Sequence, residues 1–315
     1  MASVRINLVV CIVLGIAACG ESRSPAPFVL PPGAEAISLL GDTLSPPPLA
    51  PDVRQERERR LAEAQAAYNA TPEVADSIIW LGRRLAYLGH YREAIETYTA
   101  GIALHPDDAR LYRHRGHRYI TTRRLDAAIE DLVRATQLVA GQPDQVEPDG
   151  LPNERGIPTS TLQSNIWYHL GLAHYLKGDL ARAASSYRMC LDFSNNPDML
   201  VATSHWLYMT LRRLGQSQDA AAVLTPIDAG MDIIENHSYH RLLLMYKGEI
   251  SPDSLLAEAA SGDALANATV AYGVGNWHLY NGRAEEAHQI FRQILEGSQW
   301  AAFGYVAAEA ELARR

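Results

Sequence analysis

The sequence repeats itself with a period of about 34 residues, and this period constrains the fold more than any other feature. Aligning the stretch that begins at Gly82 with the stretch that begins at Gly116 also places Ala94 over Ala128, at the same offset. A fixed period of this length is typical of helix-turn-helix units that stack into a solenoid. We therefore predict an all-α fold in which each unit buries its apolar face against the next.

The same pattern of small residues recurs further along the chain. One unit carries Gly171 and Ala183, and another carries Gly275 and Ala287. Together with Pro106, which closes the first unit, these residues resemble the tetratricopeptide-repeat family. The resemblance implies a right-handed solenoid in which small residues let the two helices of a unit approach closely, while an aromatic residue on the second helix packs against the next unit. It also implies a scaffold or adaptor that binds proteins or peptides.

The spacing between units indicates an insertion and a degenerate unit. The interval from Gly116 to Gly171 exceeds one period, and the polar, proline-rich stretch at 143–163 accounts for the excess and is expected to be a surface loop. The interval from Tyr208 to Gly275 is nearly two periods, which predicts a degenerate fifth unit between them. The predicted solenoid covers 58–315, with units near 75–108, 109–142, 164–197, 201–233, 234–267 (degenerate) and 268–297, and a capping helix at 298–315.

The N-terminus has the features of a targeting segment. Residues 1–18 carry one positive charge, at Arg5, followed by an apolar run that is shorter than the roughly 20 residues needed to span a bilayer. This pattern is typical of a signal peptide. The run ends in "IAAC", which resembles the lipobox of bacterial lipoproteins and implies a palmitate-bearing lipid on Cys19. Gly20 then implies the outer membrane, facing the periplasm or the cell surface; the alternative is an ordinary signal peptide cleaved nearby, with Cys19 incidental.

Residues 19–57 differ in composition from the repeats. Eight of the 17 prolines lie between Pro25 and Pro51. Such a segment cannot sustain helix or sheet hydrogen bonding, so we expect an extended, partly polyproline-like tether. The apolar stretch at 34–44 is a weak signal for docking elsewhere.

The cysteines exclude an intrachain disulfide framework. Cys11 lies in the signal peptide, Cys19 is the predicted lipid site, and Cys190 then stands alone. Cys190 falls in a slot of the second helix that is usually held by a small residue. We expect it to be a packing residue rather than a nucleophile.

The first helix of each unit is expected to line a concave groove, because its groove-facing slots follow the 3.6-residue period. Those slots are rich in arginine and tyrosine, the composition of binding hot spots. Alternatively, the exposed arginines serve only to keep the chain soluble, because the chain has only two lysines. The predicted groove residues are Ile79, Arg83, Tyr87, Arg110, Arg113, His117, Tyr168, Tyr175, His205, Met209, Arg212, Arg213, Tyr272, Asn276 and Tyr280.

Charge restricts the class of partner. The formal net charge is −8, and loss of Arg5 with the signal peptide makes it −9. A chain this acidic is a poor candidate for nucleic-acid binding despite the basic run at 110–118. That run is better suited to an acidic peptide or a free C-terminal carboxylate, with a phosphate group as the other possibility.

A histidine cluster supports a different interpretation. His237 and His240 have helical spacing, and His205 and His278 lie on neighbouring first helices, so the four are a candidate ligand or hydrolytic site. However, a metal site needs three or four converging ligands, and the chain has no phosphate-binding glycine loop, HExxH, paired-cysteine or GxSxG motif. We therefore predict a non-enzymatic scaffold without metal or cofactor; the alternative is a ligand-binding or hydrolytic protein that uses this cluster.

The lipobox resemblance generates a prediction about anchoring. Wild-type protein should fractionate with membranes, because several acyl chains on one cysteine together exceed the marginal membrane binding of a single chain. Cys19→Ala should release the protein or leave it unprocessed, as measured by fractionation and by mass spectrometry of the N-terminus. Unchanged fractionation of the variant, with no lipid on the wild type, would contradict the prediction.

Overall fold

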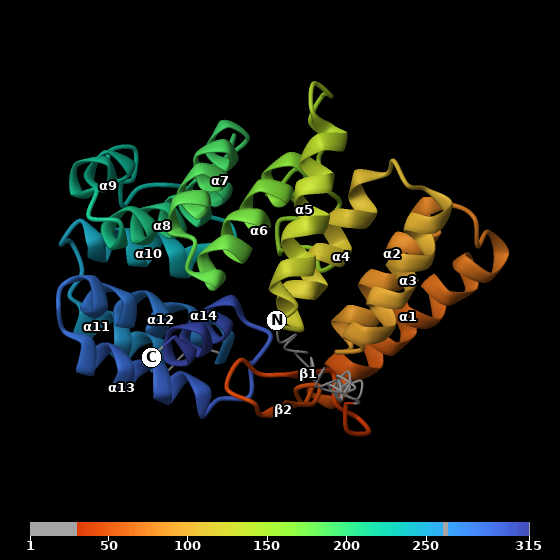
Figure 1. Cartoon of the computed structure of the whole chain (residues 1–315), viewed down its shortest axis with the longest axis horizontal. Coiled ribbons are helices and arrows are strands. Elements are labelled where there is room, and N and C mark those ends of the chain that lie inside the picture. The colour runs from red at the N-terminus through yellow and green to blue at the C-terminus, as the bar shows by residue number, and fades with distance from the viewer. Residues whose placement is uncertain (1–29, 261–263, 315) are drawn as a thin grey trace, which may run out of the picture.

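The computed structural model describes residues 30–260 and 264–314. Within these ranges it contains fourteen α-helices and a single two-stranded sheet, so the predicted all-α, tetratricopeptide-like solenoid is confirmed (Figure 1). The predicted signal peptide and Cys19 lie outside the described residues. In the described part of the chain, no helix is both long enough and apolar enough to cross a membrane.

The helices follow one another as antiparallel pairs. Six pairs form the repeats, one helix precedes them and one follows. The preceding helix is α1 (Pro51–Ala70), the pairs are α2 (Ala75–Tyr87) with α3 (Tyr91–Leu104), α4 (Ala109–Thr121) with α5 (Leu125–Val139), α6 (Leu162–Lys177) with α7 (Leu180–Asp192), α8 (Pro197–Arg213) with α9 (Ser217–Val223), α10 (His237–Tyr246) with α11 (Pro252–Ala260) and α12 (Ala264–Tyr280) with α13 (Ala284–Leu295), and the last helix is α14 (Phe303–Ala313).

A glycine facing an aromatic ring sets the distance between the two helices of a pair. In the first pair, a Cβ on Gly82 would lie 2.4 Å from the ring of Tyr98, so only glycine admits that ring. Tyr98 is 1% exposed and also stacks on His114 of the next pair, with ring centroids 5.7 Å apart. The aromatic residue therefore packs within its own unit as well as against the next one, where the sequence predicted only the second contact.

Residues 30–57 differ from the expected extended tether. β1 (Ala36–Ile37) pairs antiparallel with β2 (Thr43–Leu44), and the side chains of Ala36 and Leu44 are buried. Helix α1 begins at Pro51 and packs on α2. The reason is that proline at the first position of a helix has a favourable φ and loses no hydrogen bond, while the apolar residues between the prolines gain by burial.

The segment formed by residues 30–50, here called the strap, joins the two ends of the solenoid (Figure 1). On the N-terminal side the Glu35 carboxylate accepts a hydrogen bond from the Arg92 backbone N–H at 2.8 Å, at the start of α3. On the C-terminal side the Trp300 indole donates to the Ser45 carbonyl at 2.6 Å. The ends of the repeat array are therefore connected by the chain's own N-terminal region.

Helix α14 turns back into the solenoid and contacts α6, α12 and α13 (Figure 1). Arg123, in the turn between α4 and α5, binds Glu309 of α14 through Nη2 to Oε2 at 2.7 Å and Nε to Oε1 at 3.1 Å. These side chains are 3% and 1% exposed. A second glutamate of α14, Glu311, pairs with Arg213 at the end of α8.

The packing of the first repeat generates a stability prediction. Ala94 is completely buried between α2 and α3, so Ala94→Leu should overpack the pair and cost about 1 to 3 kcal/mol in the free energy of unfolding. The matched control is Ala100→Leu, an exposed alanine of the same helix, which should change stability little. Urea denaturation followed by circular dichroism makes the comparison, and equal stability of the two variants would show that the interface is not tightly packed.

Candidate functional site

Seven of the predicted groove residues do not face an open groove. Their exposed fractions lie between 0% and 6%, and they are Ile79, Tyr168, Tyr175, His205, Met209, Tyr272 and Asn276. Ile79 is buried in the first repeat, and the others are covered because the later repeats and the last helix fold against α6 and α8. The prediction that these residues line an accessible groove is therefore wrong, because their side chains are buried.

Several of these buried residues form an internal polar network. The hydroxyls of Tyr175 and Tyr272 are 2.7 Å apart, and the side-chain amide of Asn276 donates to both. Arg213, predicted for the groove, donates to the Tyr175 hydroxyl at 3.3 Å. Buried hydrogen-bonded networks of this kind specify one packing arrangement, so the role visible here is structural.

Three further predicted groove residues lie at the edges of the solenoid. Arg110 is 39% exposed at its side chain and is paired with Asp108 and Asp76. Arg212 lies over the ring of Tyr280, 4.4 Å from its centroid. All three remain partly exposed, but Arg110 is far along the chain from the other two and already has carboxylate partners.

The four histidines have separate environments. His205 is 1% exposed, and burial lowers its pKa to about 3, so it is neutral at neutral pH. The His240 ring is hydrogen bonded to the Asp228 carbonyl, His278 accepts a hydrogen bond from Arg283, and His237 is exposed at the start of α10. Among the described residues, no group of three or more histidine, cysteine or acidic side chains is arranged to hold a metal ion.

The structure does bring four predicted groove residues together on the first two repeats. Arg83, Tyr87, Arg113 and His117 line a small cavity of about 110 Å³ between α2 and α4. Burial lowers the pKa of Arg113 and keeps the neighbouring histidines, His114 included, neutral. The rest of the lining is Ala86, Tyr98, His114, Arg118 and, from the insertion between α5 and α6, Glu147.

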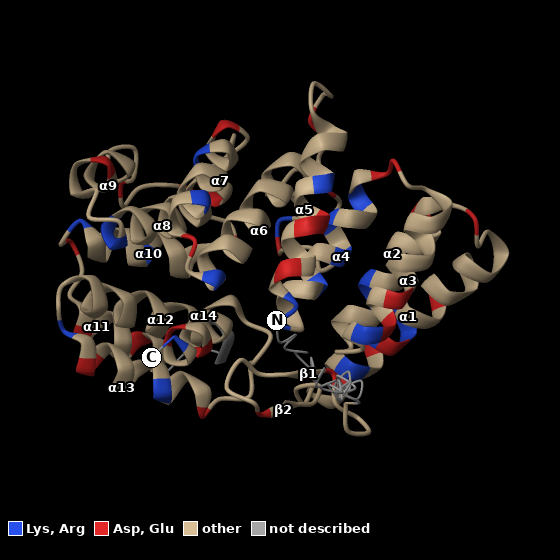
Figure 2. Cartoon of the chain, viewed as in Figure 1, with Lys and Arg blue, Asp and Glu red and all other residues tan. Residues whose placement is uncertain are grey.

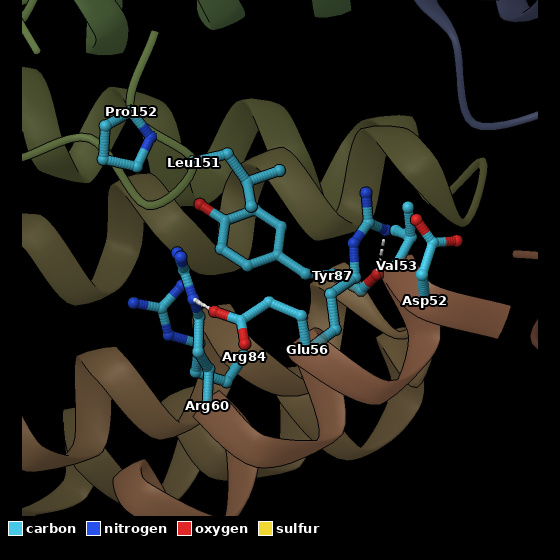
Figure 3. Close-up of a pocket in the computed structure, with 9 residues that line it drawn as sticks. Asp52, Val53, Glu56, Arg60, Arg84, Tyr87, Leu151 and Pro152 are labelled. Carbon is cyan, nitrogen blue, oxygen red and sulfur yellow. Dashed lines mark hydrogen bonds and ion pairs between the residues drawn. The ribbon is translucent and has the colours of Figure 1, made fainter. Parts of the chain in front are cut away.

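A larger and more open pocket lies beside this cavity (Figure 3). It measures about 380 Å³ and lies between α1, the end of α2 and the insertion. Figure 3 shows Leu151 over the ring of Tyr87, while the side chains of Arg60 and Glu56 approach from α1. We call it the arginine pocket, and its lining is Asp52, Val53, Glu56, Arg57, Arg60, Arg84, Tyr87, Leu151 and Pro152.

The arginine pocket has an excess of positive charge. Arg57 donates to the Tyr87 carbonyl and Arg84 donates to the Gly150 carbonyl at 2.7 Å, so both bind main-chain oxygens, and no ion pair to a carboxylate is found for either within residues 30–260 and 264–314. Burial lowers the pKa of Arg84, and the neighbouring Arg60 and Arg83 lower it further. An added anion would relieve this repulsion.

Glu56 of α1 does not form an ion pair with either of these two guanidinium groups. Hydrogen bonds from Arg59 and Arg60 lower the pKa of Glu56 to about 2, so its carboxylate is already bound. Figure 2 shows the wider pattern, in which lysine and arginine positions recur along α1 to α5. Acidic positions lie between them, so the local excess of positive charge comes from the placement of the arginines and not from a basic composition.

The sequence did not point to Arg57, Arg84 or Leu151. Arg84 is adjacent to a predicted groove slot, Arg57 lay in the expected tether, and Leu151 lay in the expected surface loop. Two features of the sequence could have indicated these residues: the arginine-rich run at 54–60 and the acidic, proline-rich insertion. They form a site only because the fold places the insertion next to α1.

Comparison with known proteins agrees with the repeat pattern. Residues 81–144 and 164–197 each match a family model described as tetratricopeptide repeat. A curated relative, BBSome complex member BBS4 of Bos taurus, is 27% identical over 141 residues, which are 45% of this chain and 23% of that protein. This chain thus aligns with less than a quarter of that relative's length.

Solved structures whose backbone follows a similar path were also found. A tetratricopeptide repeat protein from Parabacteroides merdae has a TM-score of 0.46 at 12% identity, covering 82% of this chain and 99% of that one. YrrB, described as a TPR protein with an unusual peptide-binding site, has a TM-score of 0.42 at 14% identity, covering 75% of this chain and 92% of that one.

Cys190 provides a test of the packing at the third repeat. Its thiol is completely buried and contacts the Ser164 carbonyl and the Thr203 hydroxyl, and burial raises its pKa to about 12. Because the thiolate is the reactive form, iodoacetamide at pH 8 should modify Cys190 at least about a hundredfold more slowly in the native protein than in urea. The measurement uses the chain with Cys11→Ser and Cys19→Ser, and equal rates would contradict the packing role.

Proposed function

We infer that this protein is an envelope scaffold that binds peptide segments of other proteins, and that the arginine pocket receives a free C-terminal carboxylate. The observation that carries the proposal is the pair Arg57 and Arg84, two guanidinium groups that have no carboxylate partner among the described residues and lie at the rim of a pocket with an apolar wall. The tetratricopeptide repeats support the broader statement, because solenoids of this kind present extended binding surfaces.

The chemistry of the pocket favours a carboxylate attached to an apolar group. A guanidinium binds a carboxylate through two parallel hydrogen bonds, which gives direction as well as energy. Val53, Tyr87 and Leu151 supply apolar surface beside the two arginines. A volume of about 380 Å³ accommodates the last residue or two of a polypeptide with an apolar side chain.

Membrane anchoring is the second part of the proposal. A lipid on Cys19 would place the solenoid at the outer membrane, and Gly20 after the cysteine supports that location over the inner membrane. An anchored scaffold would hold its partners near the membrane surface. The curated relative's description as a member of a complex is compatible with such a role, but it describes that protein.

The pocket can be tested with peptides of defined ends. Random hexapeptides ending in Leu or Phe, fluorescently labelled at the N-terminus, should bind with a free C-terminus and lose at least about tenfold in affinity when amidated, equivalent to about 1.4 kcal/mol. Fluorescence anisotropy gives the affinities. Arg57→Gln combined with Arg84→Gln should cause a similar loss, because both charged contacts are removed.

The matched control is Arg54→Gln combined with Arg134→Gln. It removes the same charge from the same half of the chain, but both side chains are exposed and neither lines the pocket. Its affinity should stay within about twofold of wild type. Equal binding of free and amidated peptides, or equal losses in both double variants, would refute the carboxylate assignment.

A further inference from the structure

Part of the insertion between α5 and α6 lies against α2 and α4, the first helices of the first two repeats. Its base is fixed by an antiparallel bridge between Val146 and Thr161 and by a hydrogen bond from the Glu147 N–H to the Ser160 carbonyl at 3.1 Å. From there residues 146–152, here called the acidic segment, pass over α4 and α2. Prolines at 148 and 152 favour an extended course for this segment.

Glu147 occupies the position that the sequence predicted for an external acidic ligand. Its Oε2 lies 3.0 Å from Nε of Arg113, and the two side chains are 11% and 9% exposed. Its Oε1 lies 3.9 Å from Nε2 of His114. A carboxylate of the chain itself is thus bound by the wall of the first two repeats.

The rest of the acidic segment follows the same wall. Arg83 is the favourable charge near Asp149, and Arg84 binds the Gly150 carbonyl. Gly150 passes so close to Tyr87 that a Cβ at this position would lie 1.8 Å from the tyrosine hydroxyl oxygen. The surface therefore accommodates an extended chain with a carboxylate, a second carboxylate two residues later, and then glycine.

The fit is incomplete, which makes the segment displaceable. Nε of Arg113, Oε2 of Glu147 and Oδ2 of Asp149 are buried without a hydrogen-bond partner among the described residues, so the ion pair at 3.0 Å is poorly aligned. Burial raises the pKa of Asp149, and Glu235 and Glu147 add repulsion. Leu151 leaves 47% of its surface exposed, so the segment buries little apolar area. Buried polar atoms without partners are costly, and a better-aligned ligand would recover that cost.

The far end of the insertion is held by one exposed ion pair and by the buried Thr159. Arg155 pairs with Asp232 at 2.8 Å, with both side chains about half or more exposed. Thr159 is 6% exposed, its hydroxyl hydrogen bonds to Glu235 in the loop before α10, and its carbonyl accepts a hydrogen bond from the Asn196 side-chain amide at 2.8 Å. Exposed pairs contribute little stability, so the acidic segment can lift from the repeats while Thr159 stays in place.

We propose that the acidic segment is a built-in ligand of the concave surface formed by Arg83, Tyr87, Arg113 and His114, and that the partner recognised there is an extended acidic segment of another protein with the pattern Glu-x-Asp-Gly. The partner must displace residues 146–152, so its apparent affinity is reduced by the fraction of molecules in which the segment is open. This surface goes beyond the proposed carboxylate pocket, and the two are separable by experiment.

The test opens the segment without changing any charge. Gly150→Ala introduces a Cβ for which there is no room beside Tyr87, so the segment should lift from the repeats. The probe is a peptide of residues 145–153, acetylated and amidated so that it carries no terminal charge. It should bind Gly150→Ala at least about tenfold more tightly than wild type, because the cis competitor is removed.

Two controls define the chemistry. Gly230→Ala is the same substitution in an exposed loop, where a Cβ would meet only the Asp228 side chain at 3.2 Å, and it should bind the probe as wild type does. A probe with Gln and Asn in place of the residues corresponding to Glu147 and Asp149 should bind Gly150→Ala at least about tenfold more weakly than the acidic probe.

Amide hydrogen exchange shows whether the segment has opened. Faster exchange in residues 146–152 of Gly150→Ala without tighter binding of the probe would overturn the proposal. If exchange in Gly150→Ala is unchanged, the double variant Glu147→Gln with Asp149→Asn is compared with wild type instead. Failure of this double variant to bind the probe more tightly than wild type would also overturn the proposal. Sedimentation of the wild type as a dimer that dissociates in Gly150→Ala would instead show that the segment seats between two copies, which overturns the intrachain assignment.

The outcome can be separated from that of the arginine pocket, although Arg84, Tyr87, Leu151 and Pro152 contribute to both sites. The blocked probe has no free carboxylate at its end and does not require Arg57, so Arg57→Gln should leave its binding to Gly150→Ala unchanged within about twofold. If wild-type protein does not distinguish free from amidated peptides while Gly150→Ala binds the probe, the carboxylate pocket is refuted and this proposal stands. If wild-type protein prefers free C-termini while Gly150→Ala does not bind the probe more tightly, this proposal is refuted and the carboxylate pocket stands.

Discussion

The two glutamates of α14 determine what the rest of this solenoid can do. Glu309 binds Arg123 in a pair with almost no solvent exposure, and Glu311 pairs with Arg213. Removing one partner of such a pair leaves an uncompensated buried charge, which typically costs about 3 to 5 kcal/mol, so α14 is held firmly against the second and fourth repeats. An array that is usually open along its concave side is closed at its centre by its own last helix.

This closure moves the accessible chemistry to the N-terminal end. The tyrosines and the asparagine that the period places on the concave side of the third and sixth repeats become core, with hydroxyls bound to one another as at Tyr175 and Tyr272. The strap adds to the effect by linking α3 to Trp300. What remains is the arginine-rich face of α1, α2 and α4, where the acidic insertion covers one part and leaves the pocket open. Both proposals concern this face because its guanidinium groups are held by main-chain oxygens or by a poorly aligned carboxylate.

The arginines of this face illustrate how far residue patterns can be interpreted. The structure brings Arg83, Tyr87, Arg113 and His117 together but leaves Arg110 apart, since residues on one face of consecutive first helices are neighbours in a solenoid only where they lie at the same height along those helices. The same rule placed Tyr175 and His205 on the concave side, but it carries no information on what covers that side. Arg57 and Leu151 were missed because they come from segments with no period, whose positions depend on contacts between residues far apart in the chain.

The sequence by itself determined the repeat architecture. Spacing of small and aromatic residues such as Gly82 and Tyr98 is a local requirement of two helices in contact, so a single sequence is sufficient to place the helix pairs. The tertiary structure alone decided that the strap and α14 close the solenoid and that Glu147 lies on Arg113. These contacts join residues separated by as many as 270 positions, as between Leu39 and Glu309. Their formation depends on the curvature accumulated over all the repeats and on the complementary charge that this curvature brings together, neither of which any local pattern records.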